Sequence, residues 1–301
     1  MESILITGGS GLIGSHLSRK LKEKGYDIVL LSRTSRVNGN KNTYLWNPAN
    51  NFIDPEAVCR ADYIIHLAGA GIGDKRWTRK RRKEIFESRV NTAELIHKTV
   101  LDSGKNIKAF ITISGSGYYG TLTSERIFNE TDPPGADFLG KICMFWEQAT
   151  DKFSEPGTRV VKIRTGIVLS GSGGVLSRII PPVRYGIGSP IGTGNQYMPW
   201  IHIDDLCNIF IKAIEDQDLS GAYNAAAPEH ITNRDLMKSL SKVLGKPYWF
   251  PAIPSFIMKM IFGEMSGILL EGSRVSCDKI RAAGFIFKFP ELNTALRDLL
   301  Q

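Results

Sequence analysis

The residues that most constrain the fold of this chain lie close to its start, where positions 5–14 read LITGGSGLIG. Glycine loses more conformational freedom on folding than any other residue, so a cluster of glycines indicates a backbone path that side chains would block. Ile4 to Ile6 predicts a buried strand, and after the glycines Ile13, Leu17 and Leu21 recur at helical spacing. A strand, a glycine turn and a helix in this order are the usual cradle for the phosphates of a nucleotide.

Three glycines of this turn, Gly8, Gly11 and Gly14, are spaced three residues apart. Such glycines allow a tight turn, close approach of the backbone to a pyrophosphate, and close packing of the helix on the strand. The helix then directs unpaired N–H groups and the positive end of its dipole at the phosphates. A turn that serves only the fold is the alternative. The residues predicted to contact a cofactor here are Gly8, Ser10, Gly11, Leu12, Ile13 and Gly14.

Strand-like apolar runs alternate with helical stretches through most of the chain. Runs that are apolar on both faces and separated by helices are typical of a parallel sheet covered on both sides. The expected fold class is therefore α/β, with a doubly wound parallel sheet, in which ligands bind beyond the carboxyl ends of the strands. Helical periodicity is present at 91–96 and 146–149, and the predicted strands are Ser3–Thr7, Asp27–Leu31, Tyr63–Leu67, Ala109–Ile113 and Val160–Arg164.

Basic residues follow the second predicted strand. An acidic residue at this place would bind the adenosine ribose of NAD. This chain has Arg33 and Thr34 instead, with Arg36 nearby. A guanidinium favours the 2′-phosphate of NADP through charged hydrogen bonds, each worth roughly 1.5–3 kcal/mol. The sequence therefore predicts NADP(H) as cofactor, with an ordinary surface arginine as the alternative.

Hydroxyl groups follow the predicted strand at 109–113. The stretch 114–120 reads SGSGYYG and offers Ser114 or Ser116, together with Tyr118 and Tyr119, at a strand's carboxyl end. Proton transfer beside a nicotinamide uses groups of this kind. The alternative is a polar turn with two packed tyrosines.

The net charge of +8 arises largely from positions 75–83, which read KRWTRKRRK and hold seven basic side chains. Such a run most often begins a solvated helix. Binding to the phosphates of a ligand or a polyanion is the alternative. No second basic patch accompanies the run, so the sequence does not favour nucleic-acid binding.

Cysteine spacing and hydropathy exclude other classes. The four cysteines lie at least 64 residues apart, which offers no metal-binding knuckle, redox pair or disulfide framework. Polar residues and glycines interrupt the N-terminal apolar stretch, so we expect no signal peptide. No window of about twenty residues is uniformly apolar, and Ile253 to Leu270 is interpreted as two short buried helices. We expect a cytoplasmic protein without a membrane span.

Several stretches together resemble the extended short-chain dehydrogenase/reductase family, the NAD(P)-dependent epimerases and dehydratases. TGGSGLIG resembles that family's cofactor turn, DYIIHLAG (62–69) its second cofactor-contacting strand, and PWIHIDDL (199–206) its segment entering the substrate half. Further stretches narrow the resemblance to the largely uncharacterised "epimerase family proteins", which have a small C-terminal domain. These stretches are SRV (88–90), GYYG (117–120), RTGIVL (164–169), EGSRV and AGFIFKFPEL. The resemblance implies a Rossmann fold and adds Leu67, Ala68, Gly69, Asn91, Arg164 and Gly166 as cofactor-binding residues.

This chain departs from the family where proton transfer is expected. Family members use Tyr-x-x-x-Lys, but none of the nine tyrosines here has a lysine four residues later. The segment in which this motif is expected, 137–143, reads DFLGKIC and contains Phe138 and Lys141. By resemblance Ser114 is the catalytic serine, and Tyr118 or Tyr119 replaces the lost phenol if a cation such as Lys141 lies nearby. Met198 stands where nucleotide-sugar members carry an arginine, so a UDP- or GDP-sugar substrate is not favoured.

Three functions remain open: an NADP-dependent oxidoreductase or epimerase acting on a small hydroxy or carbonyl compound, an NADP(H)-binding protein with little or no turnover, and a polyanion binder through 75–83. The resemblance places the cofactor domain at 1–165 plus 200–228, and the substrate domain at 166–199 plus 229–301. The glycine- and proline-rich stretch 171–194 is expected to form an irregular pocket wall. His202 is interpreted as a structural imidazole. A homo-oligomer is possible, but nothing in the sequence identifies an interface.

Overall fold

A computed structural model describes residues 1–34, 42–154 and 157–300. Its centre is an eight-stranded sheet with the strand order β12-β8-β6-β5-β1-β2-β3-β4. Neighbouring strands are parallel except β4, which pairs antiparallel with β3. The strands of this sheet are β1 (Ser3–Thr7), β2 (Asp27–Ser32), β3 (Thr43–Asn47), β4 (Phe52–Ile53), β5 (Tyr63–His66), β6 (Ala109–Gly115), β8 (Arg159–Thr165) and β12 (Gly221–Ala225).

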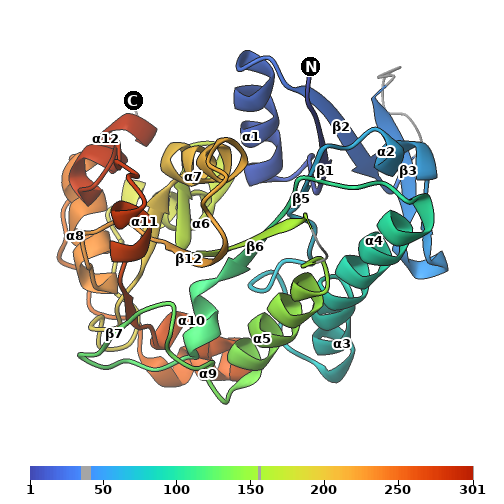
Figure 1. Ribbon diagram of the computed structural model, residues 1–301. Coiled ribbons are helices and arrows are strands. Elements are labelled where there is room, and N and C mark those ends of the chain that lie inside the picture. The colour runs from blue at the N-terminus through green and yellow to red at the C-terminus, as the bar shows by residue number, and fades with distance from the viewer. Residues whose placement is uncertain (35–41, 155–156, 301) are drawn as a thin grey trace.

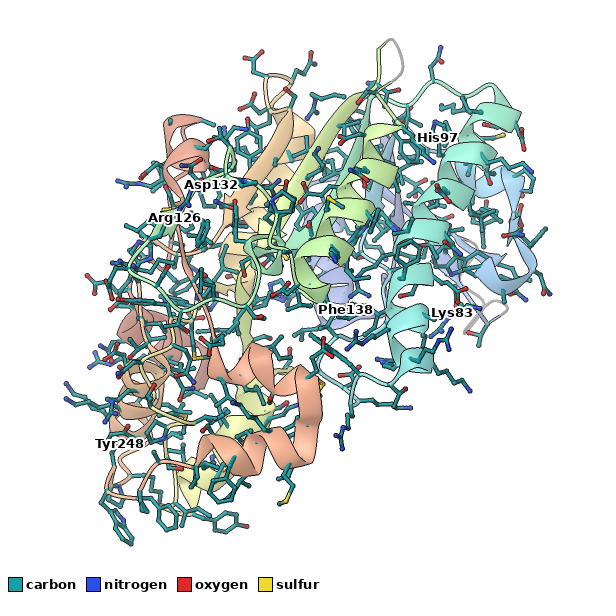
Figure 2. The ribbon with its side chains drawn as sticks, turned by 90° about the horizontal axis from the view of Figure 1, so that it is seen from below. Lys83, His97, Arg126, Asp132, Phe138 and Tyr248 are labelled. Atoms are coloured by element: carbon teal, nitrogen blue, oxygen red, sulfur yellow. The ribbon has the colours of Figure 1, made fainter. Side chains whose placement is uncertain are left out.

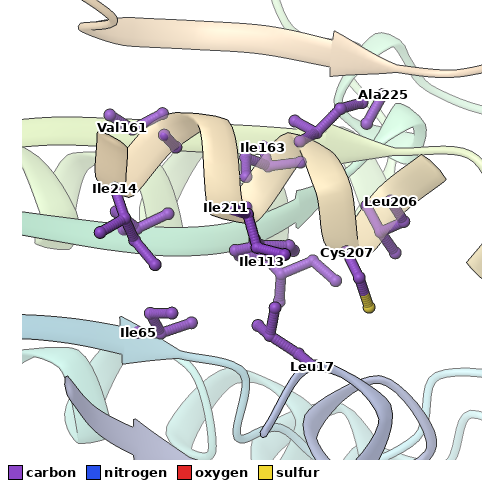
Figure 3. Packing of buried hydrophobic residues seen from close by; sticks show 14 of the residues in the cluster. Leu17, Ile65, Ile113, Val161, Ile163, Leu206, Cys207, Ile211, Ile214 and Ala225 are labelled. Carbon is purple, nitrogen blue, oxygen red and sulfur yellow. The ribbon is translucent and has the colours of Figure 1, made fainter. Parts of the chain in front are cut away.

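Both faces of this sheet are buried because its strands are apolar on both sides. Ile4 and Ile6 contribute to one core with α1 and α7, whereas Leu5 contributes to the other with α2 and α4. Figure 1 shows these helices on the two sides of the sheet, and Figure 3 shows residues of α7 facing strand residues of the first core. The flanking helices are α1 (Leu12–Glu23), α2 (Pro55–Cys59), α3 (Arg79–Glu87), α4 (Val90–Ser103), α5 (Phe138–Asp151) and α7 (Ile203–Glu215).

The other elements form a smaller part with its own core. A three-stranded sheet, β10-β9-β11, packs with α6, α8 and α12 around buried residues such as Trp200 and Leu236. A two-stranded sheet joins β13 to β7. The elements are β7 (Ile127–Phe128), β9 (Ile167–Ser170), β10 (Gly173–Gly174), β11 (Trp200–His202), β13 (Arg274–Val275), α6 (Val175–Arg184), α8 (Asn233–Val243), α9 (Ser255–Phe262), α10 (Gly267–Leu270), α11 (Asp278–Ala282) and α12 (Leu292–Leu300).

Asp204, in the first turn of α7, ties this helix to α1. Its Oδ1 atom lies 2.7 Å from Nε2 of His16 and 3.1 Å from Nζ of Lys20. Burial acts to raise the pKa of Asp204, but the hydrogen bonds with His16 and Lys20 outweigh it and lower this pKa to about 2. The carboxylate is therefore held ionised between the two helices.

The doubly wound parallel sheet is confirmed, and the five predicted strands correspond to β1, β2, β5, β6 and β8. The predicted irregular wall at 171–194 is wrong in part, because α6 forms there and buries Leu176 and Val183 even though it contains Pro181 and Pro182. The prediction of two short helices at 253–270 is correct, but neither is buried as expected: Met258 is the only buried residue of α9, and α10 has none. Among the described residues, no helix combines the length and apolar content needed to cross a membrane.

Candidate functional site

The turn between β1 and α1 leaves no space for side chains. Gly8 has a φ of 70°, and an added Cβ would lie 2.9 Å from the backbone nitrogen of Ala68. A Cβ on Gly14 would lie 2.2 Å from the carbonyl oxygen of Gly8. Gly11 caps α1 without a side-chain hydrogen bond, and the first turn holds no acidic residue. The N–H groups at the start of α1 and the positive end of its dipole are thus available to an anion.

A chain of buried polar groups fixes the ends of β1 and β5 against α4. Thr7 Oγ1 lies 2.7 Å from Nδ1 of His66 and accepts hydrogen bonds from the backbone N–H groups of Leu67 and Ala68. His66 Nε2 lies 3.2 Å from Oγ1 of Thr92. Burial lowers the pKa of His66 to about 4, so this imidazole is neutral at physiological pH. His66 was not predicted as a site residue, although it lies within the DYIIHLAG segment.

The residues predicted to bind the adenosine half of the cofactor lie at the carboxyl end of β2, the strand next to β1. Arg33 and Thr34 are exposed there, and the backbone N–H of Thr34 donates to Oγ of Ser32. Arg36, also predicted to bind the 2′-phosphate, lies outside the described residues.

Ser114 lies at the carboxyl end of β6. In the strand order β6 is two positions from β1, in the direction away from β2. It is buried, and its Oγ has no nitrogen or oxygen partner within the described ranges. The Cys143 thiol of α5 lies beside it, and burial raises the pKa of this thiol to about 11. Ser114 therefore presents a neutral hydroxyl with unused hydrogen-bonding capacity at this edge of the sheet.

The two predicted phenols differ in their surroundings. Tyr119 is buried and donates its O–H to Oδ1 of Asn224 at 2.7 Å. Burial raises the pKa of Tyr119 to about 12, and burial also raises that of the half-buried Tyr118. Tyr119 is committed to the fold, which leaves Tyr118 as the phenol of the site.

The prediction that Lys141 is the cation beside these phenols is wrong. Lys141 is exposed on α5, whereas Cζ of Arg164 lies 3.4 Å from the centroid of the Tyr118 ring. Arg164 is buried and binds both carboxylate oxygens of Glu147 at 2.8 Å, and it also donates to the Tyr119 oxygen. Arg164, predicted to bind the cofactor, is therefore occupied by an internal ion pair, and this pairing raises its pKa.

Gly166, also predicted at the cofactor, is required by packing. An added Cβ would lie 2.4 Å from the carbonyl oxygen of Pro199, just before β11. His202 is a structural imidazole, as expected, because its Nδ1 accepts the backbone N–H of Asp204 at 3.0 Å and thereby caps α7.

The start of α5, where the family's tyrosine is expected, is built for packing. Asp137 caps this helix by accepting the backbone N–H of Gly140. The Phe138 ring contacts Trp77 at a centroid distance of 4.8 Å and lies under the Arg82 guanidinium. Figure 2 shows Phe138 at this end of α5, near α3 and the C-terminal helices. An apolar ring here cannot transfer a proton.

Asn91 does not join the cofactor edge. It is exposed and lines a surface hollow with Phe52 and Glu94 on the outer side of α4. Arg89 and Thr92, by contrast, are both buried, and Thr92 contacts His66 of β5. Helical phase explains the difference, because positions 89 and 92 share a face that position 91 does not.

Part of the basic run at 75–83 is paired with acidic side chains. Arg81 is buried, donates to the Gly71 carbonyl and lies 2.7 Å from Glu84. Arg82 pairs with Glu264, which belongs to the C-terminal part of the chain. The run thus begins α3, as predicted, and also connects the sheet domain to the C-terminal helices.

These features fit a dinucleotide. The turn at Gly8 and Gly14 excludes side chains from the space that a pyrophosphate needs, and the uncapped start of α1 supplies donors for it. The turn lies between β2 and β5, the two neighbours of β1, where the strand order reverses. On one side Arg33 is exposed, and on the other Ser114 is buried, with no nitrogen or oxygen atom of the described residues bonded to its hydroxyl.

Comparison with known proteins agrees with this geometry. The chain is 34% identical to the mouse epimerase family protein SDR39U1, with 99% of each chain covered. The crystal structure of human SDR39U1 (isoform 2) with NADPH is 32% identical, has a TM-score of 0.89, and is matched over 99% of this chain and 98% of that one. A UDP-glucose 4-epimerase from Thermotoga maritima shares the fold at 21% identity and a TM-score of 0.78, with 99% and 97% covered.

The family models divide the chain in two. Residues 253–299 match a domain of unknown function, DUF1731, which confirms the expected additional C-terminal domain. Residues 4–226 match the model described as the NAD-dependent epimerase/dehydratase family. This match covers most of the chain and includes the turn, Arg33, Ser114 and Tyr118, and the chain therefore belongs to the NAD-dependent epimerase/dehydratase family.

Proposed function

We propose that this chain binds NADP(H) and reduces a small carbonyl compound. The observation that carries the proposal is the pair of hydroxyls at the carboxyl edge of the sheet: Ser114, whose Oγ has no nitrogen or oxygen partner among the described residues and lies beside the Cys143 thiol, and Tyr118 with a raised pKa. NADPH supplies a hydride when it is bound. Arg33 supports NADP(H) over NAD(H), and the related human protein was solved with NADPH.

The protonation state of the phenol favours reduction over oxidation. Burial is the largest cause of the raised pKa of Tyr118 and exceeds the opposing effect of Arg164. At neutral pH this phenol is almost entirely protonated, so it rarely acts as a base toward an alcohol. It remains able to donate a proton to the strongly basic oxygen that forms when a carbonyl is reduced. Ser114 Oγ, in the same region, orients that oxygen by a hydrogen bond.

A second candidate is an NADP(H)-binding protein with little or no turnover. It is favoured by one observation: Lys141 is exposed and Arg164 is bound by Glu147, so neither of these two cations takes the place of the family's lysine. This candidate predicts tight NADPH binding without consumption against a panel of carbonyl compounds.

The test is NADPH consumption with aldehydes, ketones and 2-oxo acids, compared between the unmodified chain and two variants. Tyr118→Phe removes the proton donor, and because general acid catalysis contributes about 10²- to 10⁴-fold, we expect a loss of kcat in that range. Ser114→Ala is expected to lower kcat by at least about tenfold, because it removes one hydrogen bond to the negative charge that develops on the carbonyl oxygen.

Tyr26→Phe is the matched control, because Tyr26 precedes β2 at the opposite edge of the sheet. Its turnover is expected to equal that of the unmodified chain. Unchanged turnover in Ser114→Ala and Tyr118→Phe would reject this site, and tight NADPH binding without turnover against the whole panel would favour the second candidate.

A further inference from the structure

Arg89 and Arg164 are both buried near the carboxyl edge of the sheet, but among the described residues a carboxylate partner is found for Arg164 and not for Arg89. Arg164 binds Glu147 through two hydrogen bonds. Arg89, which is 6% exposed, donates from Nη1 to the carbonyl of Ile85 at 3.2 Å and to Oγ of Ser88 at 3.4 Å. Its Nε has no partner, and no acidic side chain pairs with it, within residues 1–34, 42–154 and 157–300.

A buried charge without a partner is unfavourable, and proteins retain one where something else supplies the opposite charge. Burial lowers the pKa of Arg89 to about 10, which is still well above neutrality. The guanidinium therefore stays charged in the folded chain at physiological pH. The residues packed around it offer a thiol, an indole and backbone carbonyls, none of which carries a full negative charge.

The position of this guanidinium identifies the missing partner. An added Cβ on Gly69 would lie 3.1 Å from Cζ of Arg89, so the guanidinium lies against the backbone just after β5. Cys143 lies nearby, and the Trp146 ring is 5.1 Å from Cζ on the other side. β5 lies between β1, which begins the glycine turn, and β6, which ends near Ser114. Arg89 is thus on the side of the turn opposite Arg33.

We propose that Arg89 binds the nicotinamide nucleotide half of NADP(H), donating hydrogen bonds to its phosphate and ribose oxygens. Arg33 and Arg89 would then hold the two ends of one cofactor, from β2 and from the start of α4. A side chain at position 69 would press on the guanidinium, because its Cβ would lie 3.1 Å from Cζ of Arg89. The inference rests on the cofactor of the proposed function, but it does not depend on whether a carbonyl is reduced.

The test compares two ligands on two variants. NADPH carries both halves of the cofactor, whereas adenosine 2′,5′-bisphosphate lacks the nicotinamide half. For Arg89→Gln we expect Kd for NADPH to rise about 10- to 100-fold, because one charged hydrogen bond to the nicotinamide half is lost. Kd for the bisphosphate is expected to change by less than about twofold. Arg33→Gln is the matched control and is expected to weaken both ligands. Arg89→Lys, which keeps the charge, should recover part of the NADPH affinity.

The unfolding temperature without ligand separates this role from a structural one. Removal of an unpartnered buried charge is expected to leave that temperature unchanged or to raise it in Arg89→Gln. If Arg89 served only to fix Ile85 and Ser88, Arg89→Gln would lower the unfolding temperature. The proposal is overturned if Arg89→Gln binds NADPH like the unmodified chain, loses affinity for both ligands equally, or unfolds at a lower temperature. Absence of carbonyl turnover in the unmodified chain would reject the reductase alone, because both titrations measure only binding.

Discussion

Replacement of Gly14 by alanine probes the cradle at its tightest contact. The added methyl would lie 2.2 Å from the carbonyl oxygen of Gly8 and 2.7 Å from Cα of Gly9. Both neighbours are backbone atoms, so no change of rotamer relieves the clash. Carbon atoms at favourable contact are about 3.5–4.0 Å apart, so α1 and the turn must separate by roughly 1 Å or more.

This separation acts on stability and on binding to different extents. Overpacking of this kind costs about 1–3 kcal/mol of the free energy of unfolding. The same movement displaces the N–H groups at the start of α1 from a phosphate. Loss of one or two charge-assisted hydrogen bonds, each worth roughly 1.5–3 kcal/mol, raises Kd for NADPH by at least about tenfold.

The assays are chemical denaturation and calorimetric titration with NADPH. Gly267→Ala is the matched control: the same methyl is added at a helical position where its nearest neighbour would be 3.7 Å away. We expect this control to keep both stability and affinity. Gly14→Ala with unchanged NADPH affinity would refute the assignment of the turn to the pyrophosphate.

Two further predictions concern paired carboxylates of the fold, the buried Glu147 and the half-buried Asp204. Glu147→Gln leaves Arg164 charged and unpaired, so the free energy of unfolding should fall by about 3–5 kcal/mol in urea denaturation; a loss below about 1 kcal/mol would show that the pair is not structural. Asp204, whose pKa is lowered to about 2 from an ordinary value near 4, contributes stability that is complete above about pH 4 and disappears as the pH falls toward 2. Asp204→Asn should therefore unfold about 2 kcal/mol more easily at pH 7 but be little different near pH 2, and equal losses at both pH values would exclude this origin.

The strands and the turn could be predicted because their signals are local. A buried parallel strand requires apolar residues on both faces, and β1, β2, β5, β6 and β8 each show such a run. The glycine turn lies between a strand and a helix, a place that is typical of phosphate binding. The strands β3, β4 and β12 were not predicted. β4 has two residues, β12 (GAYNA) is mostly small and polar, and β3 (TYLWN) begins and ends with a polar residue.

The side chains of the site were harder to predict because they depend on helical phase and on distant partners. Arg89 was missed and Asn91 chosen, although only two positions separate them, because the sequence does not define which side of α4 faces the sheet. Arg164 was assigned to the cofactor because its partner, Glu147, lies on another element. The helix at 175–184 was missed because Pro181 and Pro182 oppose a helix locally, and the burial of Val183 overrides them.

The central claim is that the space between β2 and β5 binds NADP(H), with Arg33 on its 2′-phosphate. Calorimetric titration of NADPH and NADH into the unmodified chain and into Arg33→Asp tests it most directly. We expect one NADPH per chain, bound at least about tenfold more tightly than NADH, and a preference that disappears in Arg33→Asp. No heat of binding with NADPH, or equal affinity for both cofactors in the unmodified chain, would contradict the claim.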